Sequence, residues 1–173
     1  MRFVTLVDRI NQTLGTLAGG CALVMLLAQV FSVVTRYAFG YGIIAVQESV
    51  IYAHATMFLL GAGLVLRENG HVRVDVFYST MSQRARHIVD LVGLTVFVMP
   101  VAGVIFWLGL PYVARSWATL EGSRQSGGLP AVFLLKTMLL VFAVSVALQA
   151  IAILIRLFSG DLEQGWKRAD GHG

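Results

Sequence analysis

The chain has 173 residues and a formal net charge of +4; 57% of its residues are hydrophobic and only 13% are charged. Soluble domains usually contain about 45–50% apolar and about 25% charged residues, and the mean hydropathy here reaches +0.78. This composition excludes a soluble globular enzyme, because such a protein would expose apolar surface that it could not cover.

Long uncharged stretches account for half of the chain. They lie at residues 10–35, 49–66, 91–114 and 137–155. A helix needs about 20 mainly apolar residues to cross a bilayer. The sequence therefore predicts an all-α membrane protein whose four transmembrane helices span about 12–35, 46–66, 88–114 and 131–156. They form one membrane domain, residues 1–158, and a mobile cytoplasmic tail follows at 159–173.

The remaining pieces are too short for a soluble domain with its own core. The one cysteine, Cys21, lies inside a span, which excludes a disulfide framework or a cysteine metal site. The basic residues are spread along the chain, so they indicate membrane-flanking charge and not a nucleic-acid surface.

The first span follows Arg2 and Arg9, as a signal peptide would, but its apolar run is too long and lacks a cleavage box, so we expect a retained helix. One face of this helix recurs every seven residues: Gly15, Ala22, Gln29 and Arg36. Gly15 and Gly19 form a small-residue pattern that lets helices approach closely, although glycine is common in membrane helices generally. We interpret this face as an assembly surface.

Orientation follows from the basic residues of the short loops. With four spans, both termini and the 67–90 loop share one side, which holds nine Lys and Arg residues against four on the other. The positive-inside rule places both termini in the cytoplasm, and we expect a bacterial inner-membrane location.

The second span carries two polar residues with competing interpretations. His54 could carry protons or bind haem, but His71 and His87 fall in the loop and not at a matching depth, so a hydrogen-bonded structural role is favoured. Glu48 could drive proton-coupled transport, or it could cap its helix and pair with Arg36.

The hairpin of the first two helices predicts two contacts. Arg36 and Glu48 should form an ion pair near the outer interface, and Gln29 and His54 lie at similar depth and should hydrogen-bond. Alternatively, either residue of the inner pair faces another subunit.

The 67–90 loop contains an apolar stripe at helical spacing. It predicts an amphipathic helix over 72–88, broken near 79–82, that lies in the membrane interface; the alternative is a plain connector. The residues expected to face lipid or partner are Val74, Phe77, Tyr78 and Met81.

The later spans add a proline and a polar face. Pro100 should kink the third helix, and Ser145, Gln149 and Arg156 share one face of the fourth, which indicates packing against other helices. No nucleophile elbow, phosphate-binding glycine loop or HExxH motif is present. The residues therefore indicate a helical membrane subunit that binds other helices and is not an enzyme.

Several motifs, in order and spacing, resemble the small membrane subunit (DctQ type) of tripartite ATP-independent periplasmic (TRAP) transporters over residues 5–158. They are Arg36-Tyr37, Glu48, Gly61-Ala62, Gly70-His71-Val72-Arg73-Val74-Asp75, Gly127-Gly128-Leu129-Pro130, Lys136 and Gln149. The family often has an aromatic residue and paired acids where this chain has Val46-Gln47-Glu48, which weakens any role for a carboxylate pair.

The resemblance implies an accessory subunit that braces the scaffold of a large polytopic membrane subunit. That large subunit would carry the sodium and substrate sites, so no cofactor is expected on this chain. A periplasmic substrate-binding protein would deliver an organic acid. The alternative is a self-sufficient small proton-coupled carrier or redox membrane protein that uses Glu48 or His54.

Overall fold

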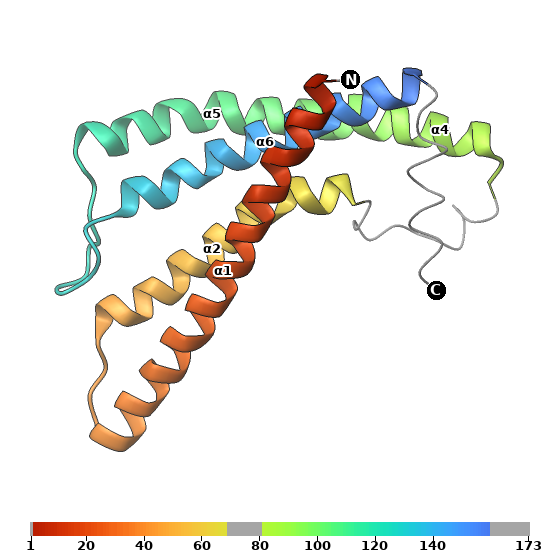
Figure 1. The fold of residues 1–173 in the computed structure, drawn as a ribbon. Coiled ribbons are helices and arrows are strands. Elements are labelled where there is room, and N and C mark those ends of the chain that lie inside the picture. Colours follow the sequence, from red (N-terminus) through yellow and green to blue (C-terminus); the bar gives the residue numbers. More distant parts are fainter. Residues whose placement is uncertain (1, 69–80, 160–173) are drawn as a thin grey trace.

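The computed structural model describes residues 2–68 and 81–159, and within them every regular element is helical (Figure 1). The elements are α1 (Arg2–Phe39), α2 (Ile44–Arg67), α4 (Gln83–Val92), the π-helical segment η1 (Gly93–Val98), α5 (Met99–Ala118) and α6 (Val132–Ser159). Four helices are long and apolar enough to cross a membrane: α1, α2, the continuous helix from Arg84 to Ala118, and α6. The prediction of an all-α protein with four transmembrane helices is confirmed.

The helices extend beyond the expected spans, and the expected ranges lie inside them apart from residue 131, which precedes α6. α1 ends at Phe39, where Gly40 adopts a positive φ of 76° and its N–H still bonds to the Arg36 carbonyl. A residue without a side chain enters this left-handed conformation at little cost. The first hairpin link is therefore only residues 40–43. The tail expected at 159–173 lies, except for Ser159, outside the described residues.

The third membrane helix is continuous but not uniformly α-helical. Between Gly93 and Val98 it widens into a π-helix, in which the Met99 N–H bonds to the Leu94 carbonyl five residues back. Pro100 follows directly; it lacks an N–H and its ring presses on the preceding turn. The expected distortion at Pro100 thus takes the form of this widened turn, a local π adjustment of the kind that accommodates proline in membrane helices.

The third helix begins at Gln83, and the hydroxyl of Ser82 caps it by accepting from the Ala85 N–H. Residues 83–88, expected to end an interfacial helix, are therefore the first turns of the membrane helix. Met81, just before it, is half-buried. The remaining interfacial residues, Val74, Phe77 and Tyr78, lie outside the described residues, so that helix stays a prediction.

The helices pack in the order α1, α2, α6, α5. In addition, the N-terminal part of α1 crosses α6 (Figure 1). The two hairpins, α1–α2 and α5–α6, diverge from that crossing. Hereafter the end with Arg2, Arg67 and Ser159 is the termini end, and the end with the 40–43 and 119–131 links is the hairpin end.

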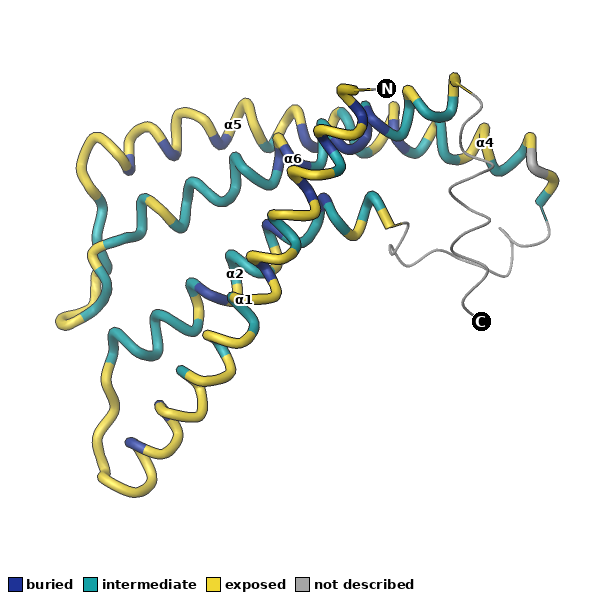
Figure 2. Tube along the Cα trace, viewed as in Figure 1, coloured by how far each residue is buried: buried dark blue, intermediate teal, exposed yellow. Residues whose placement is uncertain are grey.

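Small residues allow the close approaches at the helix crossings. A Cβ at Gly15 would lie 2.2 Å from Leu64 Cδ2, and one at Gly109 would lie 3.1 Å from Leu140 Cδ2. Lipid tails are as apolar as leucine, so close packing and polar contacts hold membrane helices together. Figure 2 shows the result: the buried residues concentrate at the crossing, and the outward faces are exposed.

Candidate functional site

Four polar residues meet where α1 crosses α6, and we call them the termini-end cluster: Asp8, Asn11, Gln149 and Arg156. Gln149 is fully buried; its amide oxygen accepts from Asn11 Nδ2 at 2.8 Å, and its amide nitrogen donates to Asp8 Oδ1 at 3.2 Å. Arg156 forms an ion pair with the other oxygen of Asp8. The face predicted from Ser145, Gln149 and Arg156 thus packs inside the chain.

α2 joins this cluster through a glycine and an arginine. A Cβ at Gly63 would lie 2.1 Å from Asn11 Oδ1 and 3.3 Å from Ser145 Oγ, so three helices meet at that point. Arg67, at the end of α2, donates to Gln12 Oε1 at 2.8 Å and to a backbone carbonyl of α1. The cluster therefore ties α1, α2 and α6 together.

A second set of polar contacts joins the two hairpins at the opposite end, and we call Glu48, Glu121, Ser123 and Lys136 the hairpin-end cluster. The Glu48 carboxylate accepts from the Ser123 hydroxyl and, at 2.6 Å, from the Leu129 N–H. A Cβ at Gly128 would lie 2.7 Å from Glu48 Oε2, so only glycine leaves room for this contact. α2 is thereby fixed to the link between α5 and α6.

Within the second hairpin, Glu121 and Lys136 form an ion pair of 2.5 Å, and Ser116 Oγ donates to the same carboxylate at 2.7 Å. The Lys136 ammonium also lies 4.0 Å from the centre of the Tyr112 ring. The hydrogen bond from Lys136, followed by that from Ser116, lowers the pKa of the Glu121 carboxyl below its ordinary value.

The ion pair predicted between Arg36 and Glu48 is wrong. Glu48 lies in the second turn of α2 and its carboxylate bonds to the other hairpin, while Arg36 is exposed and forms no ion pair within the described part of the chain. Glu48 does not cap α2 either, because the N-cap position is Ile43, which makes no side-chain cap bond.

The hydrogen bond predicted between Gln29 and His54 is also absent from residues 2–68, where both side chains are described. Both side chains are exposed and neither bonds elsewhere in the described chain. The guanidinium of Arg36 instead approaches Gly42, where Gln47 also reaches: a Cβ there would lie 3.4 Å from Arg36 Nη2 and 3.3 Å from Gln47 Nε2.

The two glycines of the expected assembly face behave differently. Gly15 packs against Leu64, so the missing side chain allows α1 and α2 of the same chain to approach closely. A Cβ at Gly19 would meet nothing within 4 Å, so Gly19 lies on an open surface.

Sequence reasoning missed Asp8, Asn11, Glu121 and Ser123. A signal existed for the first two, because Asp8 and Asn11 are three residues apart and so share a helix face. Gln149 and Arg156 are seven residues apart and likewise share one face of α6. No local signal marks Ser123, which lies 75 residues from the carboxylate that it contacts.

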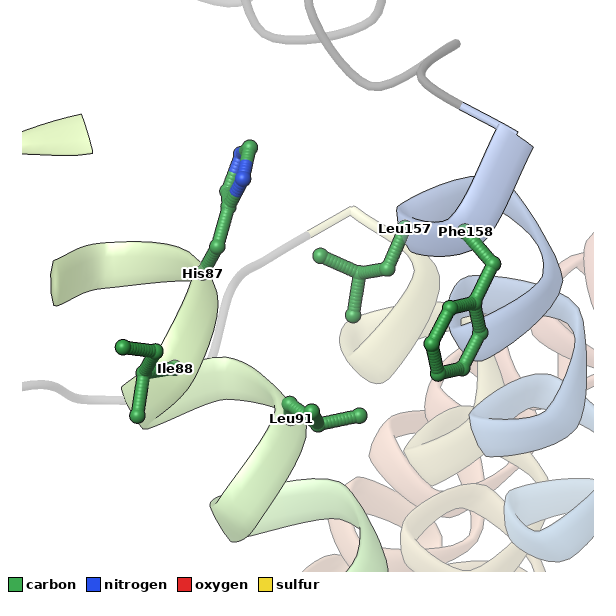
Figure 3. A pocket seen from close by; sticks show the side chains of 5 residues that line it. All are labelled: His87, Ile88, Leu91, Leu157 and Phe158. Carbon is green, nitrogen blue, oxygen red and sulfur yellow. The ribbon is translucent and has the colours of Figure 1, made fainter. Parts of the chain in front are cut away.

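One shallow pocket of about 180 Å³ lies between α4 and the end of α6 (Figure 3). Its lining is His87, Ile88, Leu91, Leu157 and Phe158. With one polar side chain in this lining, it is not built to hold a polar solute. No group of three or more His, Cys, Asp or Glu residues that could hold a metal ion occurs in residues 2–68 and 81–159.

Four apolar helices joined by two polar clusters define a multi-pass helical membrane protein. Residues 23–160 match the family described as "Tripartite ATP-independent periplasmic transporters, DctQ component". The chain belongs to this family, whose members are the small component of these transporters, and the resemblance seen in the sequence is confirmed. No curated protein and no solved structure matched the chain.

Proposed function

We propose that this chain braces the large membrane subunit of a TRAP transporter in the bacterial inner membrane. In this role it stays fixed while the large subunit moves a solute. Sodium and solute bind the large subunit, and a periplasmic binding protein delivers the solute, an organic acid.

The observation that supports this proposal most is how the buried polar groups are used. Gln149 and Asn11 bond to each other, and their neighbours Asp8 and Arg156 complete the cluster. A carrier needs polar groups that face a solute path, since such groups mark the route of substrates and ions in membranes. Here these groups hold helices in fixed positions, as a brace requires.

The alternative, a proton-coupled carrier built on Glu48, is less well supported. Its carboxylate accepts two hydrogen bonds, from Ser123 and from the Leu129 N–H. These bonds hold the carboxylate against the link between α5 and α6, whereas a carrier needs polar groups that face a solute path.

Reconstitution tests the proposal. Vesicles that contain this chain alone, the large subunit alone, or both are supplied with the binding protein, a radiolabelled organic acid and a sodium gradient. We expect uptake only when both membrane subunits are present, and none from this chain alone.

Two controls sharpen the result. A proton gradient replaces the sodium gradient, and Glu48→Gln replaces the native chain. Proton-driven uptake by this chain alone that Glu48→Gln abolishes would overturn the proposal and establish the carrier.

A further inference from the structure

Two polar side chains of the membrane helices, Gln29 on α1 and His54 on α2, are exposed and have no hydrogen bond within the described residues. Exposed threonines of α1 behave differently, because Thr13 and Thr16 return their hydroxyls to carbonyls of their own helix. An amide or imidazole facing lipid tails finds no donor or acceptor, and burying such a group unpaired is costly.

Gln29 and His54 lie at the same depth. Gln29 is ten residues before Phe39, the end of α1, and His54 is ten residues after Ile44, the start of α2. At 1.5 Å per residue, each lies about 15 Å from the hairpin end. The apolar core of a bilayer is about 30 Å thick, and a hairpin end that lies at the headgroups places both side chains inside it.

They also share one flank of the hairpin. Arg36 and Gln47 approach the same point above Gly42, and each lies seven residues, or about two helical turns, from Gln29 and His54 respectively. We call these four residues the polar stripe.

His54 points away from the junction of the three helices. Gly63 is directed into that junction, since a Cβ there would lie 2.1 Å from Asn11 Oδ1 of α1 and 3.3 Å from Ser145 Oγ of α6. His54 is nine residues away, which is two and a half turns, so it points to the opposite side of α2. α6 therefore does not cover His54, which is exposed.

We propose that the polar stripe is the surface on which a transmembrane helix of the large subunit packs, a step that rests on the proposed function. That helix must present hydrogen-bonding side chains or open backbone carbonyls at the depth of Gln29 and His54, because the stripe offers an amide and an imidazole there. Arg36 is exposed at the hairpin end, so the partner helix must place an acidic or an uncharged residue opposite it, and not a cation.

Charge argues against a second copy of this chain as the occupant. Two copies in one membrane share an orientation, so a closed pair has its two-fold axis along the membrane normal. Equivalent residues then face each other at equal depth, and Arg36 would oppose Arg36 across the contact.

Photo-crosslinking in intact membranes tests the occupant. A benzophenone side chain is placed at position 29, 54 or 104 in cells that express all the transporter components. Val104, 56% exposed on α5, is the matched control outside the stripe. We expect an adduct with the large subunit from positions 29 and 54 and none from 104.

Two results would overturn this inference while leaving the proposed function intact: adducts of twice the mass of this chain, or lipid adducts alone, in membranes where the large subunit still co-purifies. If no large subunit co-purifies with the native chain, both proposals fail.

Leucine replacements measure the contribution of each side chain. Interhelical hydrogen bonds in membranes correspond to about a threefold change in an equilibrium constant on average. We expect Gln29→Leu and His54→Leu each to weaken the subunit complex about threefold, and the double variant about eightfold. Val104→Leu should leave it unchanged. Equal or tighter association of the double variant would mean that the stripe faces lipid, which contradicts the inference.

Discussion

The three-helix contact at Gly63 depends on a missing side chain. Asn11 is 1% exposed, and its Oδ1 occupies the space that a Cβ at position 63 would need. Packed interiors do not yield easily to added atoms. The position of Asn11 therefore depends on Gly63 of α2. Because Asn11 bonds to Gln149, the position of Gln149 on α6 depends on Gly63 as well.

Gly63→Ala tests this dependence. We expect it to lower the free energy of unfolding of the detergent-solubilised subunit by about 1–3 kcal/mol, the usual cost of overpacking. Gly19→Ala is the matched control, since a Cβ there meets nothing within 4 Å and alanine favours the helix by up to about 1 kcal/mol. Thermal melting of both variants measures the difference; equal melting temperatures would contradict the prediction.

Gln149→Leu removes the central partner of the termini-end cluster. It leaves Asn11 and Asp8 with fewer hydrogen bonds in a buried setting, so we expect a loss of about 1–3 kcal/mol in unfolding free energy. Gln29→Leu, which removes an exposed amide without a partner in the described chain, should leave the isolated subunit unchanged. Denaturant unfolding followed by circular dichroism checks both, and a loss of similar size in the two variants would contradict it.

The start of α6 is fixed to the link that follows α5 through the ion pair of Lys136 and Glu121, and Ser116 of α5 donates to the same carboxylate. Trp117 adds a second connection, because its indole donates to Thr137 at 2.9 Å. The link between these helices also contacts Glu48 of α2. The α5–α6 hairpin is thus positioned by its loop as well as by its helix faces.

The lowered pKa of Glu121 predicts how this hairpin responds to acid. A carboxyl whose pKa is lower in the folded state contributes stability above its unfolded pKa, near 4.5, and loses it as the pH falls through the folded value. We expect the native chain to melt at a higher temperature than Glu121→Gln at pH 7, and the gap to narrow as the pH falls below 4.5 and through the folded pKa. A gap that widens as the pH falls below 4.5 would contradict this assignment.

At the scale of the whole molecule, the sequence predicted the helices well and their contacts poorly. Uncharged length and hydropathy determine which segments cross the membrane, and these are local properties. The face of Gln149 was also predictable from its periodicity. The partner of Glu48 was not, because spacing gives depth along a helix but not which distant loop folds over it, and Leu129 lies 81 residues away.

The orientation of the whole bundle remains a prediction from basic residues, and labelling tests it. Arg84→Cys and Ser126→Cys are each introduced into a Cys21→Ala background; both positions are exposed at opposite ends of the structure. An impermeant maleimide is added outside intact inner-membrane vesicles of known sidedness. When the periplasmic face is outside, we expect position 126 to be labelled directly and position 84 to be labelled only after permeabilisation. Labelling of 84 from the periplasmic face would reverse the topology.

The termini-end cluster has a consequence for synthesis of the protein. Asp8 and Asn11 enter the membrane region with the first helix, but Gln149 and Arg156, which bond to them, belong to the last. Until α6 inserts, the nascent chain holds polar groups without these partners in or near the bilayer. A chain truncated before α6 therefore keeps these polar groups without the partners that the completed bundle supplies.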